Sequence, residues 1–215
     1  MVNYDGLYNK NFYGKKVGQN HLSEQKLRFK VIENGTILPH KSIQNYPTGL
    51  GGILDADGNY LEESFVHHGV TEIYTPEEEI ILSDTTVIYF NMICHIWGHC
   101  LTDSLRRVWF FHSDFYKKYF KNLPIVYVPM WQGILPSFAE LLSILEIDPS
   151  RLIPSTQPTR FKEIILPDES FFETTNKETG EQEVFFTKEY QETIQRVRDY
   201  GEKNFVPLSQ KKFYF

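Results

Sequence analysis

The stretch TVIYFNMICHIWGHCLTDSLRRVWFFHSDFYKKYFKNLPIVYVP, residues 86–129, decides which fold this sequence is expected to adopt. It opens and closes on the short apolar runs TVIYFN and PIVYVP, which are typical of strands buried on both faces. Between them, from about Trp97 to Lys121, the residues follow a helical pattern. A strand, a helix and a second strand in this order predict a parallel sheet covered by helices.

The sequence after this stretch continues the same alternation. The further predicted elements are a helix across Pro136–Ile147, strands at RLIPST (151–156) and FKEIILP (161–167), a helix that begins after an N-cap at Thr187, and a last strand KKFYF (211–215). Residues 168–187 are predicted to be a polar excursion with a turn at 176–180. We therefore expect residues 85–215 to form a Rossmann-like α/β domain with a mainly parallel sheet.

The sequence before this stretch predicts a different kind of structure. Residues 1 to about 20 lack periodicity and are expected to form an extended arm. Short alternating runs interrupted at Asn34-Gly35 and at Asp57-Gly58 predict hairpins, and a further turn is expected at Ser83-Asp84-Thr85. Residues 1–84 are therefore predicted to be an arm and a small antiparallel β section.

Composition excludes several classes of protein. The 215 residues carry 28 acidic and 22 basic side chains, a net charge of −6, and their basic clusters are short, which argues against a nucleic-acid partner. No apolar run is long enough for a signal peptide or a transmembrane segment. The two cysteines favour a reducing compartment. These features predict a cytoplasmic protein, with a peripheral position at the inner membrane as an option.

Three polar residues of the central stretch, His99, Asp103 and Arg107, are spaced by four and would share one stripe of a regular helix. A carboxylate one turn from a histidine orients the ring, as in a general base, and an arginine one turn further holds the carboxylate or reaches a phosphate. The alternative is an exposed ladder of salt bridges. The bulky apolar neighbours of the stripe favour burial or a cleft. Arg106, turned away from Arg107, is expected to meet solvent or an acidic partner.

The segment HIWGHCLTDSLRRVW, residues 95–109, resembles the signature of family 61 glycosyltransferases. That signature is a His flanked by Gly and aromatic residues, an acid four residues later, an Arg four further and a Trp two beyond, which are the positions of His99, Asp103, Arg107 and Trp109. Three other segments are similar to parts of bacterial members: GGILDADGNYLEES (51–64), LEIDPSRLIPSTQPTRFKEIILPDESF (145–171) and KKFYF (211–215). Asp103 departs from these members, which often have the longer Glu.

The resemblance implies an inverting glycosyltransferase of surface polysaccharide synthesis, the N-terminal half of a GT-B-like enzyme. A nucleotide-sugar donor and a glycan would be its substrates, with no separate cofactor and no metal. His99, Asp103 and Arg107 are the implied catalytic residues, and His95, Trp97 and Arg160 the implied substrate contacts. In the family, the strand resembled by KKFYF leads into a nucleotide-binding domain. The alternative is therefore a non-catalytic half-domain that binds a glycan or a partner.

Two metal-like patterns are given another interpretation. Asp55-Ala56-Asp57 has the Asp-x-Asp form of other glycosyltransferases, but Asp57-Gly58 is better explained as hairpin chemistry. A zinc cluster of Cys94, His95, His99 and Cys100 lacks the usual pairing of ligands. His67-His68 is expected to be a surface loop rather than part of an acceptor groove.

Overall fold

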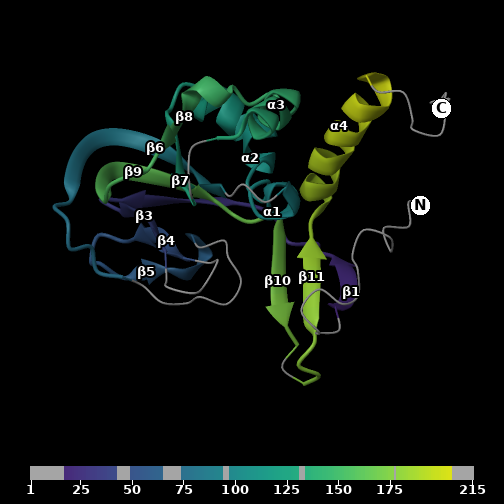
Figure 1. Ribbon diagram of the computed structural model, residues 1–215, viewed down its shortest axis with the longest axis horizontal. Coiled ribbons are helices and arrows are strands. Elements are labelled where there is room, and N and C mark those ends of the chain that lie inside the picture. Colours follow the sequence, from purple (N-terminus) through teal and green to yellow (C-terminus); the bar gives the residue numbers. More distant parts are fainter. Residues whose placement is uncertain are drawn as a thin grey trace, which may run out of the picture.

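The computed structural model describes residues 17–42, 49–64, 74–93, 97–130, 134–176 and 178–204 (Figure 1). The strands are β1 (Val17–Leu22), β2 (Phe29–Glu33), β3 (Thr36–Ser42), β4 (Gly49–Leu54), β5 (Tyr60–Leu61), β6 (Ile81–Ile93), β7 (Ile125–Pro129), β8 (Leu152–Pro154), β9 (Thr159–Pro167), β10 (Phe171–Thr175) and β11 (Gln182–Phe186). The helical segments are η1 (Glu62–Ser64), α1 (Trp97–Thr102), α2 (Trp109–His112), η2 (Tyr116–Phe120), α3 (Pro136–Ile144), η3 (Pro149–Arg151) and α4 (Lys188–Asn204).

The larger sheet has eight strands and mixed direction. Its order is β5-β4-β3-β9-β6-β7-β8, with β2 also paired to β9. The strands β9, β6, β7 and β8 run parallel, whereas β2, β3, β4 and β5 pair antiparallel with their neighbours. The parallel strands predicted at residues 86–91, 124–129, 151–156 and 161–167 are thus confirmed. The antiparallel strands of the N-terminal part join them in one continuous sheet.

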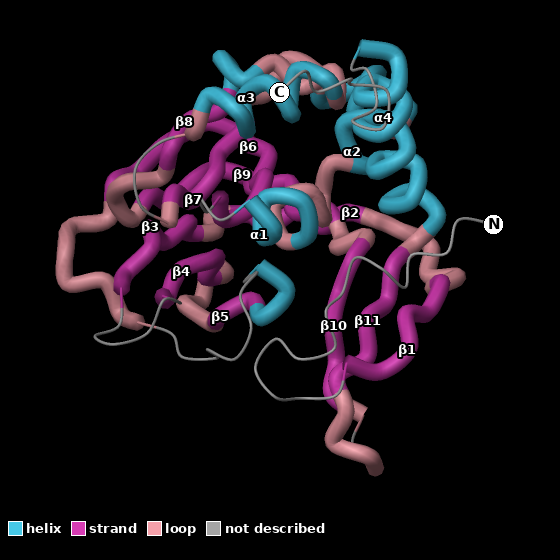
Figure 2. The backbone as a smooth tube through the Cα atoms, turned by 45° about the vertical axis from the view of Figure 1, so that its right-hand side comes forward, coloured by secondary structure: helices cyan, strands magenta, loops and turns pink. Residues whose placement is uncertain are grey.

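The expected fold class, a Rossmann-like and mainly parallel sheet covered by helices, is wrong. Among the described residues, α2, α3 and α4 pack on one face of the sheet, where they share a core with the strands. On the other face the core consists, among the described residues, of side chains from β2, β3, β4, β6, β7 and β9 and from Met130. Because β3 and β4 lie over that face, the sheet covers its own second side and needs no helices there (Figure 2).

The strand β6 illustrates how one apolar run serves both cores. Val87 and Tyr89 point into the strand-lined core, whereas Ile88 and Phe90 point into the helix-lined core. Successive side chains of a strand face opposite sides, so a continuous apolar run is what a strand buried on both faces requires. The predicted turn at Ser83-Asp84-Thr85 is wrong: β6 runs through it, with only a register shift between Ser83 and Thr86. Residues 84 and 85 therefore lie within one strand.

The two predicted Gly turns have different outcomes. The hairpin at Asp57-Gly58 is confirmed, because β4 pairs with β5 and Gly58 has a φ of 86°. The hairpin at Asn34-Gly35 is wrong: β2 and β3 follow one another along the same edge of β9. Asn34, at a φ of 53°, makes the bend between them, and a Cβ on Gly35 would meet the Ile32 side chain at 2.8 Å. A glycine is therefore needed for close packing and not for chain reversal.

A second sheet, with the order β1-β11-β10, projects from the main body (Figure 1). The hairpin of β10 and β11 falls in the region that was expected to be a polar excursion, and its turn at 176–180 is confirmed by the Gly180 N–H bond to the Asn176 carbonyl. The helix α4 begins after Thr187 as predicted. The Thr187 hydroxyl, however, is buried without a hydrogen-bond partner among the described residues, so it does not cap the helix. The predicted strand at 211–215 lies outside the described residues.

The predicted long helix from Trp97 to Lys121 is wrong. It is divided into α1, a series of turns over residues 103–108, α2 and the π-helical turn η2. The turns contain Arg106 and Arg107, whose buried side chains bond to Glu169 and to the Pro167 carbonyl, outside the predicted helix. A buried charge needs such partners, and a regular helix would have aimed the two arginines about 100° apart.

Candidate active site

The candidate site lies where α1 follows the carboxyl end of β6. β6 and β9 are parallel neighbours, so the residues after Ile93 and those after Pro167 emerge at the same edge of the sheet. In Figures 1 and 2 α1 lies beside the larger sheet, on the side toward β10. The backbone there is fixed by Ser170, whose N–H and hydroxyl both donate to the Arg106 carbonyl, at 2.8 and 2.6 Å.

The predicted pairing of His99 with Asp103 is present. His99 Nδ1 lies 2.6 Å from Asp103 Oδ2, and the other carboxylate oxygen accepts from Arg106 Nη2 at 2.5 Å. The two partners differ in accessibility: the His99 side chain is 33% exposed and that of Asp103 only 6%. A buried carboxylate therefore orients a partly exposed imidazole, which is an arrangement that suits a general base.

The charge of Asp103 is secured by its neighbours. Burial by itself raises the pKa of this carboxyl, but the hydrogen bond with His99 and the positive charge of Arg106 outweigh it and hold the pKa below the ordinary value. Burial likewise acts to lower the pKa of Arg106, and the carboxylates of Glu169 and Asp103 more than reverse that effect. At neutral pH both groups are charged, and each stabilises the charged form of the other.

Arg107 does not join the stripe that the spacing of four predicts. It is fully buried, and Nε donates to the Pro167 carbonyl at 2.9 Å while Nη1 donates to Asn91 Oδ1 at 3.0 Å. Nη2 donates to the Glu63 carbonyl. The contact with Asp103 that sequence reasoning gave to Arg107 is made by Arg106, because the chain leaves the helix after Thr102 and turns the two guanidinium groups differently.

Glu169 connects the two arginines. Its Oε2 lies 3.3 Å from Arg106 Nη1, and its Oε1 lies 3.2 Å from Arg107 Nη2. The second contact is an ion pair without hydrogen-bond alignment. The site is thus a chain of polar groups that runs from His99 through Asp103, Arg106 and Glu169 to Arg107.

Sequence reasoning missed Glu169, Asn91 and the inward position of Arg106. A signal for Glu169 existed: it follows the buried strand β9 by two residues, at the edge where β6 also ends. For Arg106 the prediction of an acidic partner is confirmed and that of solvent is not. Asn91 Nδ2 donates to the Asp103 carbonyl at 2.6 Å, so one amide links the turn of Asp103 to Arg107.

Of the three implied substrate contacts, only Arg160 has its side chain among the described residues, and it does not join this network. Arg160 lies at the start of β9, opposite Leu82 and Thr36, and the only hydrogen bond of its side chain among the described residues is 3.4 Å long, to Thr36 Oγ1. Pro167 is seven positions further along the strand, which is about 23 Å. His95 and the Trp97 side chain lie outside the described residues, as do Cys94 and His67-His68. Trp109 instead anchors α2, since Nε1 donates to the Asp168 carbonyl at 2.8 Å.

A cavity of about 200 Å³ opens on the Arg107 side of the network. Arg107, Glu169, Lys30, Glu63 and Phe172 contribute to its wall, whereas His99 does not. Lys30 and Glu63 form an ion pair there. The two ends of the network therefore differ: Arg107 lines this cavity, and His99 does not.

The zinc-like pattern includes Cys94 and His95, which lie outside the described residues, so its interpretation stays a prediction. Within the described part of the chain, no group of three or more His, Cys, Asp or Glu side chains is close enough to hold a metal ion. The carboxylate of Asp55 stabilises the hairpin turn, since Oδ1 accepts from the N–H groups of Asp57 and Asn59 at 3.0 and 2.8 Å. The interpretation of this motif as turn chemistry agrees with these bonds.

Replacement of Asp103 by asparagine is expected to lower the free energy of unfolding by about 2–3 kcal/mol at pH 7, because His99 and Arg106 both lose a charged acceptor. Since the folded-state pKa of Asp103 lies below its unfolded value, its contribution is complete above about pH 5. The contribution is lost as the pH falls through the folded-state pKa.

Urea unfolding of both proteins between pH 7 and pH 3 measures this. The difference between wild type and Asp103→Asn should shrink steadily below about pH 4. Asp57→Asn, in the exposed hairpin turn, is the matched control and should show little difference at any pH. A difference at Asp103 that does not change with pH would contradict the assignment of an ionised, partnered carboxylate.

Comparison of the chain with protein-family models, curated proteins and solved structures finds no match. Among the residues described, no helix has both the length and the apolar character needed to cross a membrane.

Proposed function

We propose that this chain carries the acceptor-activating base of an inverting glycosyltransferase, which moves a sugar from a nucleotide-diphosphate donor to a hydroxyl of a glycan in surface polysaccharide synthesis. The single observation that supports the base is the 2.6 Å contact between the partly exposed His99 and the sealed Asp103. The sugar chemistry rests on the resemblance of residues 95–109 to family 61.

The proposed reaction follows from this geometry. With Nδ1 of His99 bonded to Asp103, Nε2 is the nitrogen that takes the proton of the acceptor hydroxyl. The acceptor oxygen forms a bond to the anomeric carbon as the bond from that carbon to the diphosphate oxygen breaks, and the electron pair leaves with the diphosphate. Attack opposite the leaving group inverts the anomeric carbon. Asp103 stabilises the imidazolium that results.

Arg106 and Arg107 have a positioning role in this proposal. Their two positive charges are matched by the carboxylates of Asp103 and Glu169, so the network offers no net charge to a departing diphosphate. Arg106 holds Asp103 directly, and Arg107 acts on it only through Glu169 and Asn91. Stabilisation of the diphosphate is therefore assigned to groups outside this network.

A cytoplasmic location is part of the proposal. Its support is the low cysteine content, since a chain with two cysteines suits a reducing compartment.

A second candidate, non-catalytic glycan binding, is favoured by a row of rings on the smaller sheet. Phe172 and Phe185 stack at 5.2 Å with an interplanar angle of 4°, and His21 stacks on Phe185 at 5.0 Å. The three rings are half-buried neighbours on β10, β11 and β1. Ring edges and faces of this kind suit the apolar side of a sugar.

Assays of sugar transfer and donor hydrolysis test the proposal. We expect release of nucleoside diphosphate that depends on a glycan acceptor, and a product of inverted anomeric configuration by NMR. The assay uses this chain and any longer reading frame that contains it, with a panel of nucleotide-diphosphate sugars. Glycan binding without transfer or hydrolysis by either protein would decide for the second candidate.

A further inference from the structure

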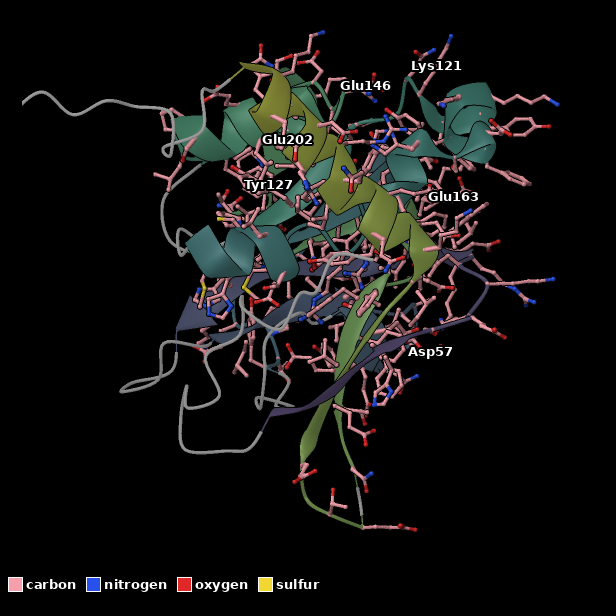
Figure 3. All side chains as sticks on the ribbon, turned by 90° about the vertical axis from the view of Figure 1, so that its right-hand side faces the viewer. Asp57, Lys121, Tyr127, Glu146, Glu163 and Glu202 are labelled. Atoms are coloured by element: carbon pink, nitrogen blue, oxygen red, sulfur yellow. The ribbon has the colours of Figure 1, made fainter. Side chains whose placement is uncertain are left out.

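A patch of basic and aromatic side chains projects from the segment that follows α2. We define the basic–aromatic patch as Phe115, Lys117, Lys118, Tyr119 and Lys121, all of them exposed. The Phe115 and Tyr119 side chains are 57% and 58% exposed, high values for aromatic residues. Figure 3 shows Lys121 at the outer edge of the molecule.

The side chains of the patch form one cluster. The rings of Phe115 and Tyr119 are 5.8 Å apart, and Lys118 Nζ lies 4.8 Å from the centre of the Tyr119 ring. The π-helical turn η2 produces this arrangement, since it places residues four and five apart on the same side. Two large aromatic rings exposed side by side are typical of a surface that binds a partner and not of a surface that only contacts water.

Aromatic contacts connect the cluster to the hydrophobic core. Phe115 packs edge-on against Phe29 at 5.7 Å, and Phe29 in turn packs against Phe110 and Phe120. An apolar hollow of about 200 Å³, lined by Phe29, Trp109, Phe110 and Leu27 among others, adjoins Phe115. Arg28 also lines it and adds a positive charge at its wall.

The charge of the patch is opposite to that of the whole protein. In the sequence, Asp114 is the one acidic residue between Asp103 and Glu140, a stretch that holds Lys117, Lys118 and Lys121, whereas the chain as a whole has a net charge of −6. Within the described residues, none of the three lysines has a carboxylate at ion-pair distance, although Lys30, Lys41 and Lys188 do. The patch therefore has unmatched positive charge for an anionic partner.

We propose that the basic–aromatic patch docks the protein onto the surface of an anionic lipid bilayer. Lysines bind the phosphate region, exposed Phe and Tyr rings settle at the boundary between headgroups and acyl chains, and the hollow beside Phe115 receives apolar groups. A projecting turn with two rings at its tip fits a deformable lipid surface, whereas an acidic peptide would need a groove or a free strand edge. The proposal does not depend on the transferase activity.

Sedimentation with lipid vesicles tests the proposal on the full chain. We expect binding to vesicles of phosphatidylcholine with about 30% phosphatidylserine, and at least tenfold weaker binding to phosphatidylcholine alone. Raising the salt concentration from about 0.05 to 0.5 M should release the protein, because it shortens the range of the charge interaction.

Two variants locate the contact. K117Q/K118Q/K121Q should weaken binding roughly fivefold for each lysine, or about a hundredfold. F115S/Y119S should weaken it at least tenfold at unchanged charge. The matched controls are K162Q/K188Q/K203Q, which removes the same charge elsewhere, and L82S, which removes a side chain that is 76% exposed on β6. All sites are exposed, and circular dichroism checks that each variant is folded.

Equal binding to both kinds of vesicle, or equal effects of the patch variants and their controls, would overturn the proposal. Binding to a poly-glutamate peptide without binding to anionic vesicles would also overturn it, and would indicate an acidic protein partner. Because vesicle binding and sugar transfer are measured separately, failure of either leaves the other result intact.

Discussion

Replacement of His99 by alanine is expected to lower kcat for sugar transfer about 10²- to 10⁴-fold, with little change in KM. The reason is that the imidazole takes up a proton only as the acceptor attacks, so its loss affects the transition state and not the bound ground state. Steady-state kinetics of acceptor-dependent diphosphate release measures both constants.

Asp103→Asn tests the role of Asp103 in orienting the base, separately from the role of the base itself. The amide keeps the size of the side chain but removes the charge that faces His99 Nδ1 and Arg106 Nη2. We expect a loss of similar order to that of His99→Ala, and a double variant that is scarcely worse than either, because the two groups act as a unit. The acidic limb of the pH–rate profile should also move, which a merely structural role would not cause.

Ser143→Ala is the matched control for both substitutions. Ser143 is exposed on α3, and its hydroxyl donates to the Ala139 carbonyl within that helix. Its removal should leave kcat within about threefold of the wild-type value. Turnover close to wild type in both His99→Ala and Asp103→Asn would refute the assignment of the base.

Replacement of Arg107 by methionine is expected to lower the free energy of unfolding by about 3–5 kcal/mol. Methionine fills similar volume but leaves the carbonyls of Pro167 and Glu63, the Asn91 amide and Glu169 without their cation in a buried place. Removing one partner from a buried polar network is more destabilising than replacing the whole network by apolar residues, because the groups that remain stay buried without a partner. Urea or thermal unfolding measures the change.

Arg160→Met provides the comparison for Arg107. Arg160 is half-buried and has one long hydrogen bond to Thr36, so its loss should lower the unfolding free energy by less than about 1 kcal/mol. A double variant R107M/E169M would be expected to recover part of the stability, since it removes both buried charges of the pair. If R107M is no more destabilising than R160M, Arg107 does not brace the fold.

The His99–Asp103 pair could be predicted because it depends on local geometry. Residues four apart are neighbours on any helix, and the first turn and a half of the predicted helix does form, as α1. Arg107 was beyond the end of α1, so the same rule failed for it. Where the helix ends is set by the partners of Arg106 and Arg107, which come from β6, η1 and the residues after β9. No local pattern contains those partners.

The sequence by itself determined the elements whose signals lie within a few residues. The buried strands β6, β7 and β9, the helices α3 and α4, and the turn at Asp57-Gly58 belong to this group, since alternation, length and turn residues are local properties. Only the tertiary structure decided what covers the second face of the sheet. A strand buried on both faces has the same apolar run whether helices or other strands lie over it, and here β3 and β4 take the place of helices. The site also depended on the tertiary structure, because long-range contacts and not residue spacing made Arg106 the partner of Asp103.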